Sequence, residues 1–205
     1  MTMIDSFIRN LKPFKLWLKL STLIFFGSAL VFGVFSFLFP DVIINAFHGY
    51  FGEIEQMGDK IFGTNPFYGT AVLFWNNFTA VLVMIFMGII LALPTFFALL
   101  VNGGALGVLA SILTLQGENP LVFYGLGILP HGIFEVPAIL IAGGLGLKIG
   151  YQILFPPEGI NRGSNLKNNI KAGIKILPGI IIMLAVAAVI EIFITPFMLG
   201  LVAEI

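Results

Sequence analysis

The chain has 205 residues, of which 59% are hydrophobic and 10% are charged, and it contains no cysteine. This composition excludes an ordinary soluble globular protein, and the missing thiols exclude disulfides and cysteine chemistry. Ten basic and ten acidic residues balance, so net charge gives no sign of nucleic-acid binding. We therefore expect an all-α integral membrane protein, a polytopic transmembrane helical bundle in the lipid bilayer.

Two short amphipathic segments and five apolar stretches follow along the chain. Residues 1–17 and the loop 40–67 place apolar residues at helical spacing among charges, which predicts short interfacial helices. The same stripes could instead pack on the spanning helices. The five stretches each supply the about 20 apolar residues that a span requires. Within a single membrane domain, 1–205, the predicted spans are 18–39, 68–93, 95–115, 121–147 and 176–201, and residues 148–175 form a loop with a flexible part at 156–169.

The distribution of lysine and arginine predicts the orientation of these spans. With five spans, nine of the ten basic residues fall on one side, in residues 1–17, at the start of the first span and in the loop 148–175. Only Lys60 falls on the other side, in the loop 40–67. We therefore expect a multi-pass protein of the cell membrane with a cytoplasmic N-terminus and an outer C-terminus.

A few polar side chains interrupt the predicted spans. An ionisable group at bilayer depth is costly and should face protein or a water-filled cavity, so each one is a candidate functional residue. We expect these side chains to form one buried polar cluster that joins the second to fifth spans. Its predicted members are Asn76, Asn77, Asn102, His131, Glu135 and Glu191.

The segment "PHGIFEVPA" carries the strongest part of this signal. His131 and Glu135 are four residues apart and share one helical face. Pro130 and Pro137 flank them, which predicts a kinked or broken fourth span. The pair could be a hydrogen-bonded lock between helices, or it could hold a proton or a divalent metal ion with Glu191, since one imidazole and two carboxylates suit Zn, Mn or Fe.

Enzymatic activity is not indicated by the remaining residues. A zinc hydrolase would require a fuller ligand set, and the second histidine, His48, lies in the outer loop. Ser36 and Ser111 have no recognisable base partner. An intramembrane metal-dependent hydrolase is therefore the weakest of the functional hypotheses, and we assign no catalytic residue.

Glycines form the other sequence signal. Small residues let transmembrane helices approach closely, and "NGGALG" and "AGGLG" predict helix contacts or self-association into a homo-oligomer. The two segments also look alike while running in opposite directions, which is consistent with an inverted repeat or with coincidence. The glycines concerned are Gly103, Gly104, Gly107, Gly143, Gly144 and Gly146.

Four segments together resemble the stage II sporulation protein M family of multi-span membrane proteins. They are "FWNNFTAVLVMIFMGI" from Phe74, "LLVNGGALGVLAS" from Leu99, "PHGIFEVPAILIAGGLGLKIG" from Pro130 and "AAVIEIFITP" from Ala187. The resemblance implies a non-catalytic organising or anchoring subunit, which in spore-forming bacteria sits in a membrane complex with two peptidoglycan-degrading proteins. Its partners would then be other membrane or cell-envelope proteins. The alternative is a transporter or channel that moves an ion or small solute through the polar cluster.

Overall fold

The structure, a computed structural model, describes residues 3–62 and 65–203, and these residues form helices and short connections without strands. Five helical segments are long and apolar enough to cross a membrane, which confirms the all-α transmembrane bundle. The sequence predicts on which side of the membrane each chain end lies, and both ends fall outside the described residues. The helices are α1 (Met3–Leu11), η1 (Lys12–Phe14), α2 (Lys15–Leu38), α3 (Pro40–Phe62), α4 (Pro66–Met87), α5 (Leu93–Leu115), α6 (Pro120–Phe123), η2 (Tyr124–Ile128), α7 (Leu129–Leu154), α8 (Arg162–Phe193) and α9 (Thr195–Ala203).

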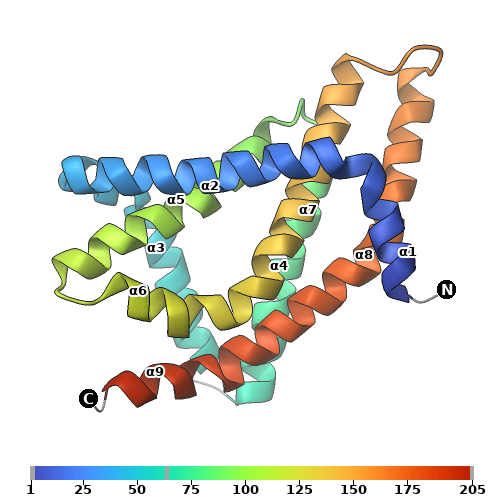
Figure 1. The fold of residues 1–205 in the computed structure, drawn as a ribbon. Helices are drawn as coiled ribbons and strands as arrows, with labels where there is room; N and C mark the ends of the chain where they lie inside the picture. Colours follow the sequence, from blue (N-terminus) through green and yellow to red (C-terminus); the bar gives the residue numbers. More distant parts are fainter. Residues whose placement is uncertain (1–2, 63–64, 204–205) are drawn as a thin grey trace.

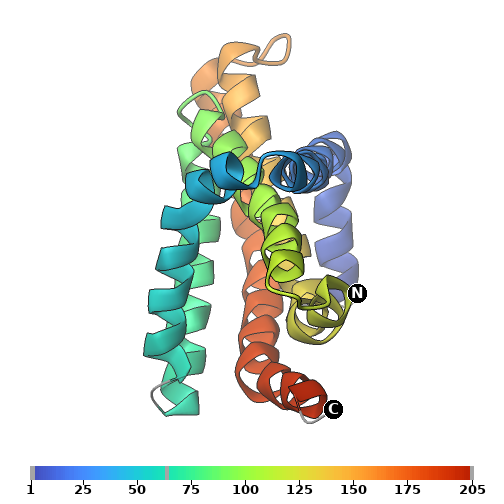
Figure 2. The same cartoon turned by 90° about the vertical axis from the view of Figure 1, so that its left-hand side faces the viewer.

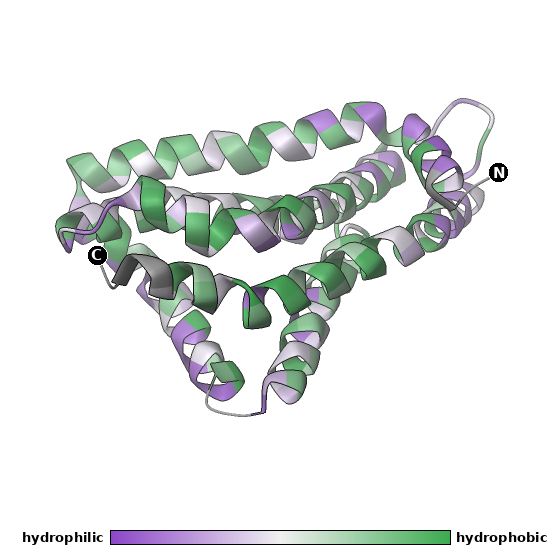
Figure 3. Ribbon diagram, turned by 60° about the horizontal axis from the view of Figure 1, so that its bottom comes forward, coloured by the Kyte–Doolittle hydropathy of each residue, from purple (hydrophilic) through white to green (hydrophobic). Residues whose placement is uncertain are grey.

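Helix α7 is the centre of the bundle. It packs against α2, α4, α5 and α8, while α2 lies along α5 and α3 forms a hairpin with α4 (Figures 1 and 2). The largest apolar cluster includes Leu145 and Ile149 of α7 together with Ile176, Ile180 and Leu184 of α8. Hydrophilic residues gather on α1, at the start of α2 and around the α7–α8 connection, whereas the rest of α2 is hydrophobic (Figure 3).

Asparagine side chains cap the N-termini of three helices. Asn65 accepts a hydrogen bond from the Phe67 amide at the start of α4, and Asn119 accepts one from the Leu121 amide at the start of α6. Both are followed by proline, which has no amide hydrogen to satisfy at the first helical position. Asn161 caps α8 in the same way, through the amide of Ser164.

The predicted packing glycines lie where helices touch. Atoms of a neighbouring helix stand within 3.1 Å of the position that a Cβ atom would take at all six of them. At Gly107 of α5 that Cβ would overlap the Ala29 carbonyl of α2, and at Gly146 of α7 it would overlap the Met84 carbonyl of α4. Backbone therefore rests directly on backbone at these crossings, as small residues in membrane helices allow.

Buried hydroxyl groups join the same helices. Ser21 of α2 donates to the Leu140 carbonyl of α7 at 2.8 Å, and Thr95 of α5 donates to the Met84 carbonyl of α4 at 2.6 Å. Since lipid offers no hydrogen-bond partner, such contacts satisfy polar groups and also tie helices together.

The two amphipathic segments pack on the spanning helices, which is one of the two arrangements that their sequences allow. Phe7 of α1 lies against Gly179 of α8. In α3, Phe47 is buried together with Ala105 and Val108 of α5. Their apolar stripes thus cover the bundle.

The fourth span is segmented, but the break lies before the prolines. Residues Tyr124–Ile128 form a π-helix, and the Tyr124 hydroxyl donates a hydrogen bond to the Leu106 carbonyl of α5. Pro130 sits in the first turn of α7, where a missing amide hydrogen is tolerated. Pro137 lies inside α7, which continues through it to Leu154.

Two connections differ from the sequence prediction. Residues 88–92 form a tight turn, so α4 ends at Met87 rather than at residue 93. Leu91 and Ala92 have positive φ, and Ala92 fits against Gly150 of α7. The predicted loop 148–175 is too long at both ends, because α7 continues to Leu154 and α8 begins at Arg162, where Asn165 and Asn169 bond Gln152 of α7. Hydropathy alone shows neither feature.

Alanine at Gly107 should destabilise the protein by about 1–3 kcal/mol, because its methyl group would push α5 away from the Ala29 carbonyl. Gly27→Ala is the matched control, since a Cβ there meets nothing within 4 Å. It should be neutral or slightly stabilising, as alanine favours helix over glycine. Thermal unfolding of both variants in detergent measures the difference. Equal stability would contradict the close α2–α5 crossing.

Candidate functional site in the membrane-spanning helices

Three ionisable side chains converge between α7 and α8. His131 and Glu135 occupy the first turns of α7, directly after the π-helix, and Glu191 lies near the end of α8. One ligand atom from each residue lies within 4.8 Å of the other two. Glu191 lies 56 positions after Glu135 in the sequence. The antiparallel packing of α7 and α8 brings it beside His131 and Glu135.

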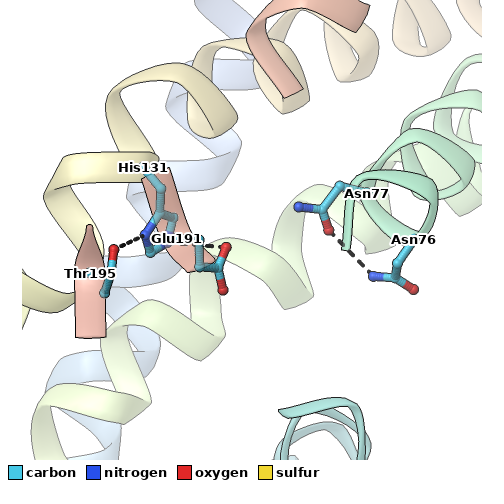
Figure 4. Close-up of polar contacts among 5 residues, drawn as sticks. All are labelled: Asn76, Asn77, His131, Glu191 and Thr195. Atoms are coloured by element: carbon cyan, nitrogen blue, oxygen red, sulfur yellow. Dashed lines mark hydrogen bonds and ion pairs between the residues drawn. The ribbon is translucent and has the colours of Figure 1, made fainter. Parts of the chain in front are cut away.

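His131 contacts residues on two other helices. Its Nε2 atom lies 3.9 Å from an oxygen of Glu191, and its Nδ1 atom lies 3.4 Å from the hydroxyl of Thr195 at the start of α9 (Figure 4). Side-chain exposure is 14% for His131 and 25% for Glu191. The imidazole therefore links α7, α8 and α9.

Asn102 lies on α5 and is bound to a residue of α3. The Tyr50 hydroxyl donates to the Asn102 side-chain oxygen at 3.3 Å, and the Asn102 amide donates to the Ala98 carbonyl. Burial, with a smaller effect of the negative charges of Glu135 and Glu53, raises the pKa of Tyr50 to about 12. The phenol therefore stays protonated at neutral pH and remains a hydrogen-bond donor.

Asn76 and Asn77 belong to α4 and lie apart from His131 and Glu191 (Figure 4). The Asn76 amide donates to the Asn77 side-chain oxygen at 3.3 Å, and Asn76 is exposed. Among the polar residues singled out in the spans, the structure thus gathers His131, Glu135 and Glu191 into one group. It gives Asn102 a separate partner and leaves the two α4 asparagines bonded to each other.

The donor set of this group, hereafter the His–Glu cluster (His131, Glu135 and Glu191), fits a cation. One imidazole nitrogen and two carboxylates match the mixed ligands that Zn, Mn and Fe accept. Ligand atoms around tetrahedral zinc are about 3.3 Å apart, given bonds of roughly 2.0–2.2 Å. The three ligand atoms lie within 4.8 Å of one another, and the His131 Nε2–Glu191 oxygen distance is 3.9 Å, so small rotations of the side chains would be needed to surround such an ion.

The serines considered as nucleophiles have structural partners. Ser36 donates to the Gly33 carbonyl, and Ser111 donates to the Ser36 carbonyl across the α2–α5 contact at 3.1 Å. Both hydroxyls are fully buried. His48 is exposed on α3. These contacts give the serines a packing role.

Two residues that contact the predicted polar side chains were not identified from the sequence. Thr195 stands four positions after Glu191 in "EIFIT", and that helical spacing is the signal that could have indicated it. Tyr50 comes from the amphipathic α3, and its approach to Asn102 depends on how α3 folds over α5. No local pattern in the sequence reveals such a contact.

Comparison with known proteins gives a consistent result. Residues 22–196 match the sequence profile of the family described as stage II sporulation protein M. The chain is also 36% identical over 121 residues to an uncharacterized protein of Methanocaldococcus jannaschii, in a match that covers 59% of this chain and 67% of that protein. No solved structure matches the chain.

Replacement of Glu135 tests whether the cluster is one polar unit. Glu135→Gln keeps a polar group, so the free energy of unfolding should fall by less than about 1 kcal/mol, whereas Glu135→Leu leaves His131 and Glu191 short of a partner and should cost about 1–3 kcal/mol. Glu118→Leu, at an exposed connection, is the control. Thermal unfolding in detergent measures all three.

Metal analysis of the purified parent protein accompanies this comparison. One equivalent of zinc, manganese or iron that is lost from both Glu135 variants would assign a metal centre, because an amide is a poor substitute for a carboxylate ligand. Absence of metal with the expected stabilities would assign a hydrogen-bonded lock. A Glu135→Leu protein as stable as the parent would contradict both.

Proposed function

The chain belongs to the stage II sporulation protein M family, and we propose that it acts as a non-catalytic scaffold or anchoring subunit of a membrane complex. The observation that carries this proposal is the convergence of His131, Glu135 and Glu191 between α7 and α8, with Thr195 of α9 on the imidazole. Ionisable groups of α7 and α8, extended to α9 by the Thr195 hydroxyl, would hold this end of the bundle together.

Energetics support a locking role for the His–Glu cluster. An isolated charge at the centre of a membrane helix costs about 2.5–3.5 kcal/mol on insertion scales. Two carboxylates this close repel each other when both are ionised. One of them must therefore carry a proton, or an imidazolium or metal cation must lie between them. A bound cation or shared proton therefore compensates the cost, and it does so only while α7 and α8 remain in register.

A transporter or channel is the second candidate function, and two observations favour it. The π-helix Tyr124–Ile128 interrupts the fourth span immediately before the cluster, and interrupted helices line many membrane transport sites. Glu191 also keeps 25% of its side chain exposed. A site that exchanges a cation with water would need such access.

Flux and assembly measurements separate the two functions. A scaffold should show, in native membranes, an assembly larger than the protein itself that contains other membrane or cell-envelope proteins. Liposomes that hold the full chain should show no more proton or divalent-cation flux than liposomes that hold Glu135→Gln. Flux in the parent that Glu135→Gln abolishes would establish transport and overturn the scaffold. A protein that remains alone in its membrane would also contradict the scaffold.

We also propose that the N-terminus is cytoplasmic and the C-terminus lies outside, on the basis of the lysine and arginine distribution. Single cysteines at Ser164 of α8 and Gln56 of α3, both exposed, should react with a membrane-impermeant maleimide from opposite sides. The cysteine-free parent is the control. Labelling of both positions from the same side would contradict this topology.

A further inference from the structure

A cavity of about 480 Å³, lined in part by basic and amide side chains, lies at the opposite end of α7 from the His–Glu cluster. Its walls are formed by the end of α1, by η1, by the last turns of α7 and by the first turns of α8, and the α7–α8 connection closes one side. The volume falls within the about 300–1,000 Å³ of sites that bind small ligands. We refer to this space as the basic cavity.

Four cations line the basic cavity although they come from three separate segments. They are Arg9 of α1, Lys148 of α7, and Lys171 and Lys175 of α8. Among the lining residues that the structure describes there is no carboxylate. Glu158 belongs to the same connection but does not line the cavity.

The wall of the basic cavity is fixed by hydrogen bonds. Asn169 donates to the side-chain oxygen of Gln152 at 2.8 Å, and Asn165 donates to the Gln152 main-chain carbonyl at 3.1 Å. Asn165 and Asn169 are 6% and 4% exposed. The start of α8 is thereby held against the end of α7, and Lys171 and Lys175 follow on α8 among the lining residues.

Lys148 is held by an aromatic ring. Its Nζ atom lies 4.2 Å from the centre of the Phe14 ring, and Phe14 is 2% exposed. A cation over an aromatic face is stabilised electrostatically, so the ammonium group has a defined position beside the cavity. The charge of Lys148 is therefore built into the wall rather than carried on a mobile surface side chain.

We propose that the basic cavity binds a phosphate group, and that the phosphate is the headgroup of an anionic phospholipid. Converging lysines and an arginine, with amide donors beside them, are the chemistry that recognises phosphate oxygens. A soluble phosphate compound offers the same oxygens.

The position of the cavity favours the lipid. Lys175 directly precedes the buried apolar residues of α8 that begin at Ile176, and Lys148 lies near the end of the apolar α7. Hydrophilic residues gather at this end of the bundle (Figure 3). The cations thus lie at the level where the spans leave the membrane, and basic pockets between helices at that level bind anionic headgroups.

Lipid binding to the full chain in a non-ionic detergent tests this proposal, with native mass spectrometry as the readout. The probes are dioleoylphosphatidylglycerol, dioleoylphosphatidylcholine and inorganic phosphate. The variant Lys171→Gln/Lys175→Gln removes two cavity cations, and Arg162→Gln/Lys167→Gln removes two exposed cations from the same helix outside the cavity. Asn168→Asp adds a negative charge to the lining while keeping every lysine.

The parent should bind phosphatidylglycerol in preference to phosphatidylcholine. The Lys171→Gln/Lys175→Gln protein should bind phosphatidylglycerol about tenfold to thirtyfold more weakly, Asn168→Asp should also bind it more weakly, and Arg162→Gln/Lys167→Gln should match the parent within about twofold. Equal melting temperatures show that all proteins are folded.

Three other outcomes are decisive. In the first, inorganic phosphate binds the parent and binds the Lys171→Gln/Lys175→Gln variant more weakly, while phosphatidylglycerol and phosphatidylcholine bind equally well. This result would support a phosphate site but overturn the proposal that the phosphate belongs to a lipid. Equal losses in the two double variants would show attraction by overall charge and overturn the site. A parent that binds neither phosphatidylglycerol preferentially nor phosphate would also overturn it. None of these outcomes depends on the scaffold proposal, because they concern the other end of α7.

Discussion

The close approach of α7 to its neighbours is the constraint on which the rest of the structure depends. Without water to drive helix association in lipid, packing must come from direct van der Waals contact, and backbones can meet only where side chains are absent. Gly146 lies against the Met84 carbonyl of α4 and Gly150 against Ala92, and a Cβ atom at Gly144 would stand 3.1 Å from the Trp17 backbone of α2. Three neighbours thus contact one glycine-rich stretch. The turn at residues 88–92 keeps its positive φ angles because Gly150 leaves room for it.

The second constraint is the cost of charge in the membrane, and the chain meets it by concentrating its intramembrane charges. His131, Glu135 and Glu191 come together only because α7 and α8 run antiparallel and bring the start of one beside the end of the other. The hydrogen bonds of Asn76 and Asn77 are made locally within α4. Neutral amides can be satisfied within one helix, whereas a carboxylate requires an opposite charge or a proton from elsewhere.

The sequence was sufficient to predict the five spans and the His131, Glu135 and Glu191 candidates, because length, apolarity and buried charge are properties of single segments. It was insufficient wherever an apolar turn joins two spans, as at residues 88–92, since hydropathy does not change there. The early start of α8 depends on Asn165 and Asn169 finding Gln152 on another helix. Tyr50 meets Asn102 only after α3 folds back. Each of these features depends on a contact between segments that no local pattern in the sequence indicates.

One end of α7 carries a site with two carboxylates, and the other end carries a site lined by basic side chains. The tightly packed middle of the helix separates the two sites. His131 and Lys148 are 17 residues apart, or about 25 Å along a helix. Between them, Leu145 packs into the space beside Gly173 of α8, and Ile180 and Leu184 are fully buried. Close-packed interiors resist small displacements, so a change of charge at one end need not move the other. The α7–α8 pair therefore provides a close-packed frame that gathers one imidazole and two carboxylates at one end and basic side chains around a cavity at the other.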